Sequence, residues 1–267
     1  ERVVREWDLD GIKLDFIDSF HVGGDDRAIA ENYSGRDIHS LPEAVDVLLS
    51  GIIRRLREIK PEIMIEFRQS YIGPAIRKFG NIFRAADCAF DMLQNRVRTL
   101  DLRLLSGNTA VHSDMLIWSK EETPEVAALQ ILNVIFSTPQ ISCMLTELPS
   151  SHLRMLAFWM SFCMRHRKTL QESKLRPEHP EHSYPVVTAE SAEETITALY
   201  ETDRVVRLNA SHRHIVLNAT HAPELLIETP HPRKCIVFNT FGEEVLRCEV
   251  SGLARVAVPA SGFAEFE

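Results

Sequence analysis

The strongest constraint on the fold is an alternation of short apolar runs with longer amphipathic runs over residues 1–170. The short runs are rich in Ile, Val, Phe or Met and are bounded by turn or cap residues, as buried parallel strands are. They are GIKLDF (11–16), EIMIEF (62–67), IFRAADC (82–88), TAVHS (109–113) and QISCML (140–145). Repeated strand–helix units of this kind predict a parallel sheet with helices packed outside it.

Three amphipathic runs predict the helices between these strands. Residues 41–59 place Leu and Ile on one face, and Ser40 with Glu43 forms a capping box at the start. Residues 124–136 begin with Thr123 as cap and with Pro124 in the first turn. Residues 151–168 carry apolar side chains at helical spacing.

Two architectures fit this alternation, an open doubly wound sheet and a barrel. No G-x-G-x-x-G or Walker A sequence follows any of the predicted strands, which disfavours a nucleotide-binding open sheet. A complete (β/α)8 barrel has eight strands in about 250 residues. The first ten residues, ERVVREWDLD, are typical of a helix end running into a strand. We therefore expect the C-terminal part of a longer polypeptide, with the first barrel units outside it.

The composition changes near residue 175. The segment RPEHPEHSYP at 176–185 is rich in Pro and His and is interpreted as a linker. Beyond it, six short β-patterned runs indicate a small sandwich: 205–210, 214–220, 224–229, 234–239, 244–250 and 254–259. The predicted fold class is α/β: the C-terminal portion of a (β/α)8 TIM barrel over 1–175, the linker, and an antiparallel β-sandwich over 186–267.

Composition narrows the function classes. The net charge is −8 and no Lys/Arg block stands out, which argues against nucleic acid as a partner. No apolar run is long and uniform enough to predict a membrane span. The five cysteines contain no C-x-x-C and are too scattered for a disulfide scaffold, so we expect a cytoplasmic protein. We predict neither a cofactor nor a resident metal.

Charged side chains are expected at one end of three consecutive strands. Side chains alternate along a strand, so Lys13 and Asp15 share the face opposite Ile12 and Leu14. Glu66 and Arg68 share a face of the next strand in the same way. Asp87 ends the third strand, whereas Arg84 falls on the other face unless a bulge redirects it. Active sites of parallel barrels lie at these carboxyl ends.

Carboxylates after parallel strands also serve as helix N-caps, so one alone indicates little. Asp15, Glu66 and Asp87 together fit two chemistries. Retaining glycosidases use one carboxylate as nucleophile and another as general acid/base. Magnesium-dependent lyases or isomerases of the enolase type use carboxylates on successive strands as metal ligands, with a Lys base.

The run WDLDGIKLDFIDSF resembles the nucleophile strand of glycoside hydrolase family 36, the α-galactosidase or melibiase type, whose clan includes families 27 and 31. The later run IEFRQSYIGP…GNIFRAADC is similar to that family's next two strands. The resemblance covers residues 1–170 in order, and the C-terminal sandwich fits the family's layout. Two loops depart from the pattern: FRQSYIGP replaces a Cys- and Gly-rich loop, and Ala85-Ala86 replaces a Trp-Ser pair.

The resemblance implies a retaining α-glycosidase acting on a glycoside or oligosaccharide. It implies Asp15 as nucleophile, Asp87 as general acid/base and Lys13 as a ligand of sugar hydroxyls. Arg68 or Arg84 would also bind the sugar, and Glu66 is a further substrate-binding candidate. The departing loops shape the sugar pocket, so family 31 α-glucosidases and α-xylosidases remain alternatives for the sugar.

Asp87 is expected in an apolar setting made by Phe83, Ala85 and Ala86, and Lys13 is expected to keep Asp15 ionised. A non-catalytic carbohydrate-binding module is a third reading. Because strands that hold the sugar would lie outside this segment, we expect the segment alone to be poorly active. An incomplete barrel also exposes sheet edges, which favours a homo-oligomer.

Overall fold

The computed structural model describes residues 1–15, 19–21, 37–68, 73–208 and 212–267. These residues form two compact units. The first comprises 1–86 and 105–111, and the second comprises 87–104 and 112–267. Phe16, predicted at the end of the first strand, lies outside the described residues.

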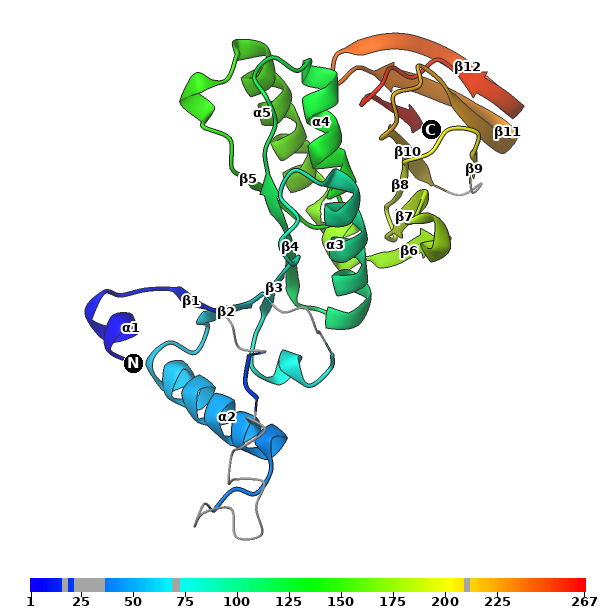
Figure 1. Ribbon diagram of the computed structural model, residues 1–267. Coiled ribbons are helices and arrows are strands. Elements are labelled where there is room, and N and C mark those ends of the chain that lie inside the picture. The colour runs from blue at the N-terminus through cyan, green and yellow to red at the C-terminus, as the bar shows by residue number, and fades with distance from the viewer. Residues whose placement is uncertain (16–18, 22–36, 69–72, 209–211) are drawn as a thin grey trace. The chain divides into compact units, whose positions relative to one another are not determined.

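The first unit contains a small parallel sheet (Figure 1, blue to cyan). Its strands pair in the order β1-β2-β3 and all run in the same direction. The elements are α1 (Arg2–Glu6), β1 (Gly11–Leu14), α2 (Leu41–Ile59), β2 (Met64–Phe67), the 3-10 helix η3 (Ile76–Lys78) and β3 (Ile82–Arg84). The predicted passage from a helix end into a strand over the first ten residues is confirmed.

The bounds of α2 match the predicted helix residue for residue. The Ser40 hydroxyl accepts a hydrogen bond from the Glu43 amide at 3.3 Å, which satisfies one of the free N–H groups of the first turn. Leu49, Ile53 and Leu56 are buried at helical spacing and form the apolar face of the helix.

The register of β1 on β2 depends on a glycine. Gly11 lies opposite Met64, and a Cβ at this position would come within 2.8 Å of the Met64 Cβ. At the start of β3, the Asn81 side chain accepts from the Ile65 amide at 2.8 Å and donates to the Ile63 carbonyl at 3.2 Å. These contacts fix the strands whose carboxyl ends carry the charged residues.

The second unit combines helices with a large sheet (Figure 1, green to red). The strands β4 (Ala110–Leu116) and β5 (Thr138–Ile141) pair in parallel. The helical elements are α3 (Met92–Ser106), α4 (Pro124–Asn133), α5 (Ser150–Arg165), the π-helix η5 (Lys168–Glu172) and the 3-10 helices η4 (Leu145–Glu147) and η6 (Pro180–His182). Thr123 caps α4 as predicted, accepting from the Val126 amide.

The large sheet has eight strands in the described residues. Seven follow the order β12-β11-β13-β10-β8-β7-β6, and β9 pairs with β11. They are β6 (Lys174–Glu178), β7 (Val186–Glu190), β8 (Glu194–Leu199), β9 (Val205–Arg207), β10 (Arg213–Asn218), β11 (Leu225–Phe238), β12 (Glu244–Val256) and β13 (Phe263–Phe266). Most neighbours are antiparallel, but β10 pairs in parallel with β8, and β11 with β9.

Both faces of this sheet are covered. Alternate residues of β10, such as Ile215 and Leu217, join one core with Ile131 of α4 and Trp159 of α5. The intervening Val216 belongs to a second core. That core holds side chains from β8 to β13, among them Leu199, Ile227, Val237, Val250 and Phe266. Burial on both faces explains why β8 has no exposed residue.

Three sequence-based expectations need correction here. The predicted strands 244–250 and 254–259 are one strand, β12, which runs from Glu244 to Val256. Residues 176–178 of the interpreted linker belong to β6, which pairs with β7. The predicted strands 224–229 and 234–239 are one strand, β11, with a register shift between Thr229 and Arg233. The domain limits at 175 and 186 remain predictions.

Among the described residues, no helix has the length and hydropathy that a membrane span requires.

Candidate active site

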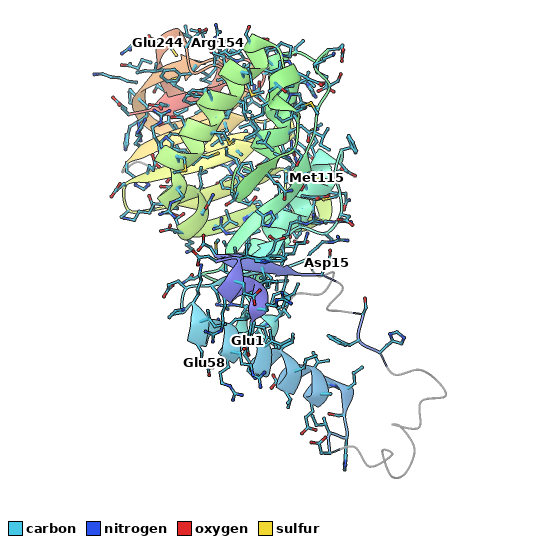
Figure 2. All side chains as sticks on the ribbon, turned by 90° about the vertical axis from the view of Figure 1, so that its left-hand side faces the viewer. Glu1, Asp15, Glu58, Met115, Arg154 and Glu244 are labelled. Atoms are coloured by element: carbon cyan, nitrogen blue, oxygen red, sulfur yellow. The ribbon has the colours of Figure 1, made fainter. Side chains whose placement is uncertain are left out.

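Asp15 and Arg68 lie side by side where two neighbouring strands end. Asp15 directly follows β1 (Figure 2), and Arg68 directly follows β2. The Arg68 Nη1 donates to Asp15 Oδ2 at 3.3 Å. The Asp15 side chain is 37% exposed and that of Arg68 is 26% exposed. The carboxylate is thus held by a cation and still open to a reactant.

One position earlier on each strand, a second pair of opposite charges faces across the sheet. Lys13 and Glu66 are direct register partners, and Lys13 Nζ lies 3.8 Å from Glu66 Oε1. Arg68 is thus a cation at ion-pair distance from Asp15, and Lys13 lies opposite Glu66 on the same face of the sheet. That Lys13 keeps Asp15 ionised stays a prediction.

The two faces of β2 differ as the alternation predicts. Ile63, Ile65 and Phe67 are fully or almost fully buried, whereas Met64 is 46% exposed. The four charged side chains share the more open face and sum to zero charge. A neutral, hydroxyl-rich ligand would find both donors and acceptors on this surface.

Arg84 is the last residue of β3 and is only 6% exposed. The preceding Phe83 is buried with its ring 6.3 Å from that of Phe67. Charged side chains are seldom buried in this way unless they are paired. Arg84 is therefore part of the interior of this unit, not of its open surface.

The predicted third strand, 82–88, is shorter in the structure: β3 ends at Arg84, so Asp87 does not end this strand as expected. Asp87 begins the second unit, and its side chain is exposed. This corrects the expectation of an apolar setting made by Phe83, Ala85 and Ala86. The Asp87 carbonyl accepts a hydrogen bond from Arg98 Nη1 of α3 at 2.7 Å, which fixes the backbone at this position.

A buried network that sequence reasoning missed holds the residue after Asp87. Asp114 of β4 is 1% exposed and accepts from the Cys88 amide at 2.6 Å. Asn95 of α3 accepts from the Asp114 amide at 2.8 Å. Burial is the main cause that raises the pKa of Cys88 to about 11. The position of Asp114 in an otherwise apolar strand is the sequence signal for this network, because a buried carboxylate requires hydrogen-bond donors.

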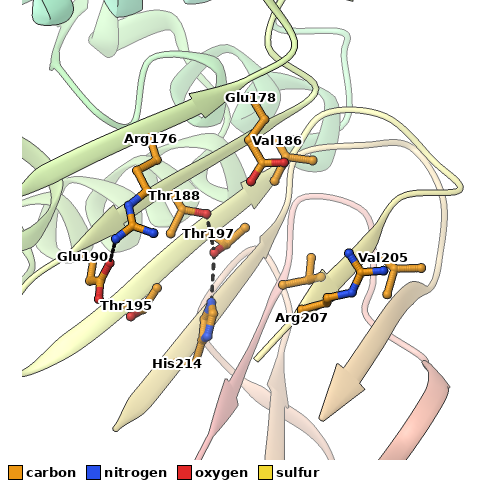
Figure 3. Close-up of a pocket in the computed structure, with 11 residues that line it drawn as sticks. Arg176, Glu178, Val186, Thr188, Glu190, Thr195, Thr197, Val205, Arg207 and His214 are labelled. Atoms are coloured by element: carbon orange, nitrogen blue, oxygen red, sulfur yellow. Dashed lines mark hydrogen bonds and ion pairs between the residues drawn. The ribbon is translucent and has the colours of Figure 1, made fainter. Parts of the chain in front are cut away.

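The sheet of the second unit holds a polar cavity of about 250 Å³ (Figure 3). A chain of hydrogen bonds crosses it from Thr188 to Thr197 at 3.0 Å and from Thr197 to His214 at 2.9 Å. Arg176 and Glu190 form an ion pair at its edge at 2.7 Å. Burial, with Arg233 and His212, lowers the pKa of His214 to about 4, so the imidazole is neutral near pH 7.

Among the described residues, no group of three or more His, Cys, Asp and Glu side chains is placed to hold a metal ion.

No protein-family model and no curated protein matches the chain. Solved structures do. A family 27 β-L-arabinopyranosidase from Geobacillus stearothermophilus, in complex with arabinose, aligns with TM-score 0.53 at 12% identity over 100% of this chain and 60% of its own. The wild-type form of that enzyme aligns with TM-score 0.54 at 13% identity, over 100% and 59%.

An α-amylase from Geobacillus thermoleovorans, complexed with acarbose, aligns with TM-score 0.54 at 10% identity over 99% of this chain and 61% of its own. The chain shares its fold with barrel glycosidases. At these identities the likeness concerns the fold, because function depends on particular sites. The chain spans about 60% of the arabinopyranosidase length.

Proposed function

We propose that the chain is part of a retaining α-glycosidase, most similar to α-galactosidases, with Asp15 as its nucleophile. The observation that carries the proposal is the Asp15–Arg68 pair at 3.3 Å at the carboxyl ends of adjacent parallel strands. Barrel enzymes place their catalytic groups at these ends. The shared fold with barrel glycosidases supports the same reading.

The reaction takes place in two displacements. The Asp15 carboxylate attacks the anomeric carbon while Asp87, in its protonated form, donates its proton to the departing glycosidic oxygen. A glycosyl ester with Asp15 forms. Asp87 then takes a proton from water, which attacks the same carbon and releases Asp15 with net retention.

Of the remaining charged residues, Lys13, Arg68 and Glu66 bind the sugar in this proposal. Lys13 and Arg68 donate to hydroxyl oxygens, Glu66 accepts from hydroxyl groups, and Arg84 holds the end of β3. Arg68 also keeps Asp15 oriented through their hydrogen bond.

The galacto configuration is the proposed sugar class. A β-L-arabinopyranoside has the ring configuration of an α-D-galactopyranoside without the hydroxymethyl group. The structural match to the arabinopyranosidase therefore agrees with a galactose-like substrate. The gluco and xylo configurations are the alternatives to include in an assay.

Hydrolysis of aryl glycosides tests the proposal. We expect slow turnover by the 267-residue chain. Asp15→Asn should lower this turnover by at least about 1,000-fold, because the nucleophile is lost. Asp46→Asn is the matched control. Asp46 is an exposed carboxylate on α2 that forms an ion pair with Lys78 of η3. Full activity in Asp15→Asn would refute the assignment.

A second candidate function is carbohydrate binding without turnover, which the polar cavity in the sheet favours. Its threonine hydroxyls, its neutral His214 and its paired charges suit a small polyhydroxyl ligand. Titration with galactose and arabinose, monitored by nuclear magnetic resonance, tests it. Resonances around Thr197 should shift, and Thr197→Val should abolish the shift. No shift at millimolar sugar would exclude this function.

Two further predictions concern the whole protein. Association into homo-oligomers is proposed from the sheet edges that an incomplete barrel exposes, and a cytoplasmic location is proposed from the cysteine content. Val47 and Leu48 of α2 are 53% and 47% exposed, which agrees with association of the first unit.

A further inference from the structure

Two of the five cysteines face each other across the hairpin of β11 and β12. Cys235 and Cys248 are direct register partners in this antiparallel pair. Both side chains lie on the same face, because Cys235 belongs to the second core and Cys248 packs against it. Both are free thiols.

The backbone places the two residues at a distance that a disulfide can span. The Lys234 amide donates to the Glu267 carbonyl at 3.1 Å, and the Glu267 amide donates to the Lys234 carbonyl at 3.0 Å. The backbone groups of Lys234 thus point away from β12, and those of Cys235 point toward it. Cys235 and Cys248 are therefore a hydrogen-bonded pair, with Cα atoms about 5.5 Å apart. Disulfides span about 4.4–6.8 Å.

The two thiols differ in access. Cys248 is half-buried on β12, the edge strand of the sheet. Cys235 is fully buried on β11. Burial raises the pKa of the Cys235 thiol, and the neighbouring Cys248 raises it further. A reagent in solution thus reaches Cys248 first. The buried Cys235 thiol then reacts with Cys248 and not with the reagent.

We propose that Cys235 and Cys248 form an oxidation site that closes to a cross-strand disulfide in the presence of a small-molecule disulfide. The Cys248 thiol loses its proton, and its thiolate sulfur attacks glutathione disulfide, forms a mixed disulfide and releases one glutathione thiolate, which takes up that proton. The Cys235 sulfur then loses its proton and attacks the Cys248 sulfur, which releases the second glutathione. The two cysteines are oxidised, and one glutathione disulfide is reduced to two glutathione molecules.

The test is exposure of the folded chain to glutathione disulfide, followed by acid quenching, alkylation and peptide mass mapping. We expect the protein to lose two hydrogens in mass, with Cys235 and Cys248 in one linked peptide pair. Three of the five thiols should remain open to alkylation after denaturation, since 5 − 2 = 3. Alkylation of all five thiols would overturn the proposal.

Single variants separate the two steps. Cys235→Ser should stop the reaction at a glutathione adduct on Cys248, and Cys248→Ser should yield no linked pair. Cys143→Ser is the matched control, because Cys143 is also half-buried and hydrogen-bonds to Trp118. It should close the disulfide as the wild type does. A stable glutathione adduct on wild-type Cys248, without closure, would contradict the proposal.

Discussion

At the residue scale, the division of labour between Asp15 and Asp87 is open to direct test. Asp87→Ala removes the proposed acid, so turnover of glycosides with poor leaving groups should fall by about 100- to 10,000-fold. Aryl glycosides with acidic phenols need little protonation and should be largely spared in the first displacement. Comparing the two substrate types in the variant and in the wild type measures this. Equal losses would mean that Asp87 is not the acid.

His214 gives a prediction of pH dependence. Its pKa is about 4 in the folded protein, against an ordinary value of 6.5, mainly because burial disfavours the imidazolium. Between these values the unfolded chain binds more protons than the folded one. The free energy of unfolding should therefore fall as the pH drops from about 6.5 to about 4, by up to about 1.4 kcal/mol per pH unit.

Urea unfolding at several pH values checks this dependence. His214→Gln should flatten it, whereas His221→Gln, at an exposed position, should leave it unchanged. The same slope in His214→Gln and in wild type would show that another group is responsible.

At the element scale, one hydrogen bond to a side chain caps the start of α2. Ser40→Ala removes the hydroxyl that accepts from the Glu43 amide, and the free energy of unfolding should fall by about 1 kcal/mol. Ser50→Ala, within the same helix, should change it by less than about 0.5 kcal/mol. Thermal or urea unfolding monitored by circular dichroism measures both. Equal effects would contradict the capping role.

Elements with strong local patterns could be predicted from the sequence. The apolar spacing and the Ser40 cap gave α2 its bounds, and the alternation in EIMIEF gave the two faces of β2. Pro177 predicts a linker where the structure has the strand β6. Proline occurs in β6 because this strand lies at the edge of the sheet, the place in a sheet where proline is tolerated. Likewise, Pro230 and Pro232 predict a break between two strands. In the structure they lie within β11, at the register shift between Thr229 and Arg233.

The site was predictable only in part. Alternation placed Lys13, Asp15, Glu66 and Arg68 on one face, but which cation meets which carboxylate depends on the register between β1 and β2. That register is set by the close contact of Gly11 with Met64, which are 53 positions apart in the chain by their numbers. The partners of Asp114 are likewise distant in sequence, so no local pattern names them.

At the scale of the whole molecule, metal removal separates two reaction classes. A glycosidase that works through Asp15 and Asp87 needs no divalent ion, so hydrolysis should be unchanged after dialysis against a strong chelator. An enzyme of the enolase type would lose its activity and regain it with Mg²⁺. Chelator-sensitive turnover would favour the magnesium reading and contradict the glycosidase mechanism.

Trapping the glycosyl ester tests the role of Asp15 as nucleophile most directly. The chain is incubated with a 2-deoxy-2-fluoro glycoside that carries a good leaving group, in the galacto and arabino configurations, and is then mapped by peptide mass spectrometry. We expect a covalent sugar on Asp15, absent from Asp15→Asn and present in Asp46→Asn. A sugar attached to a different carboxylate, or no attachment at all, would contradict this role.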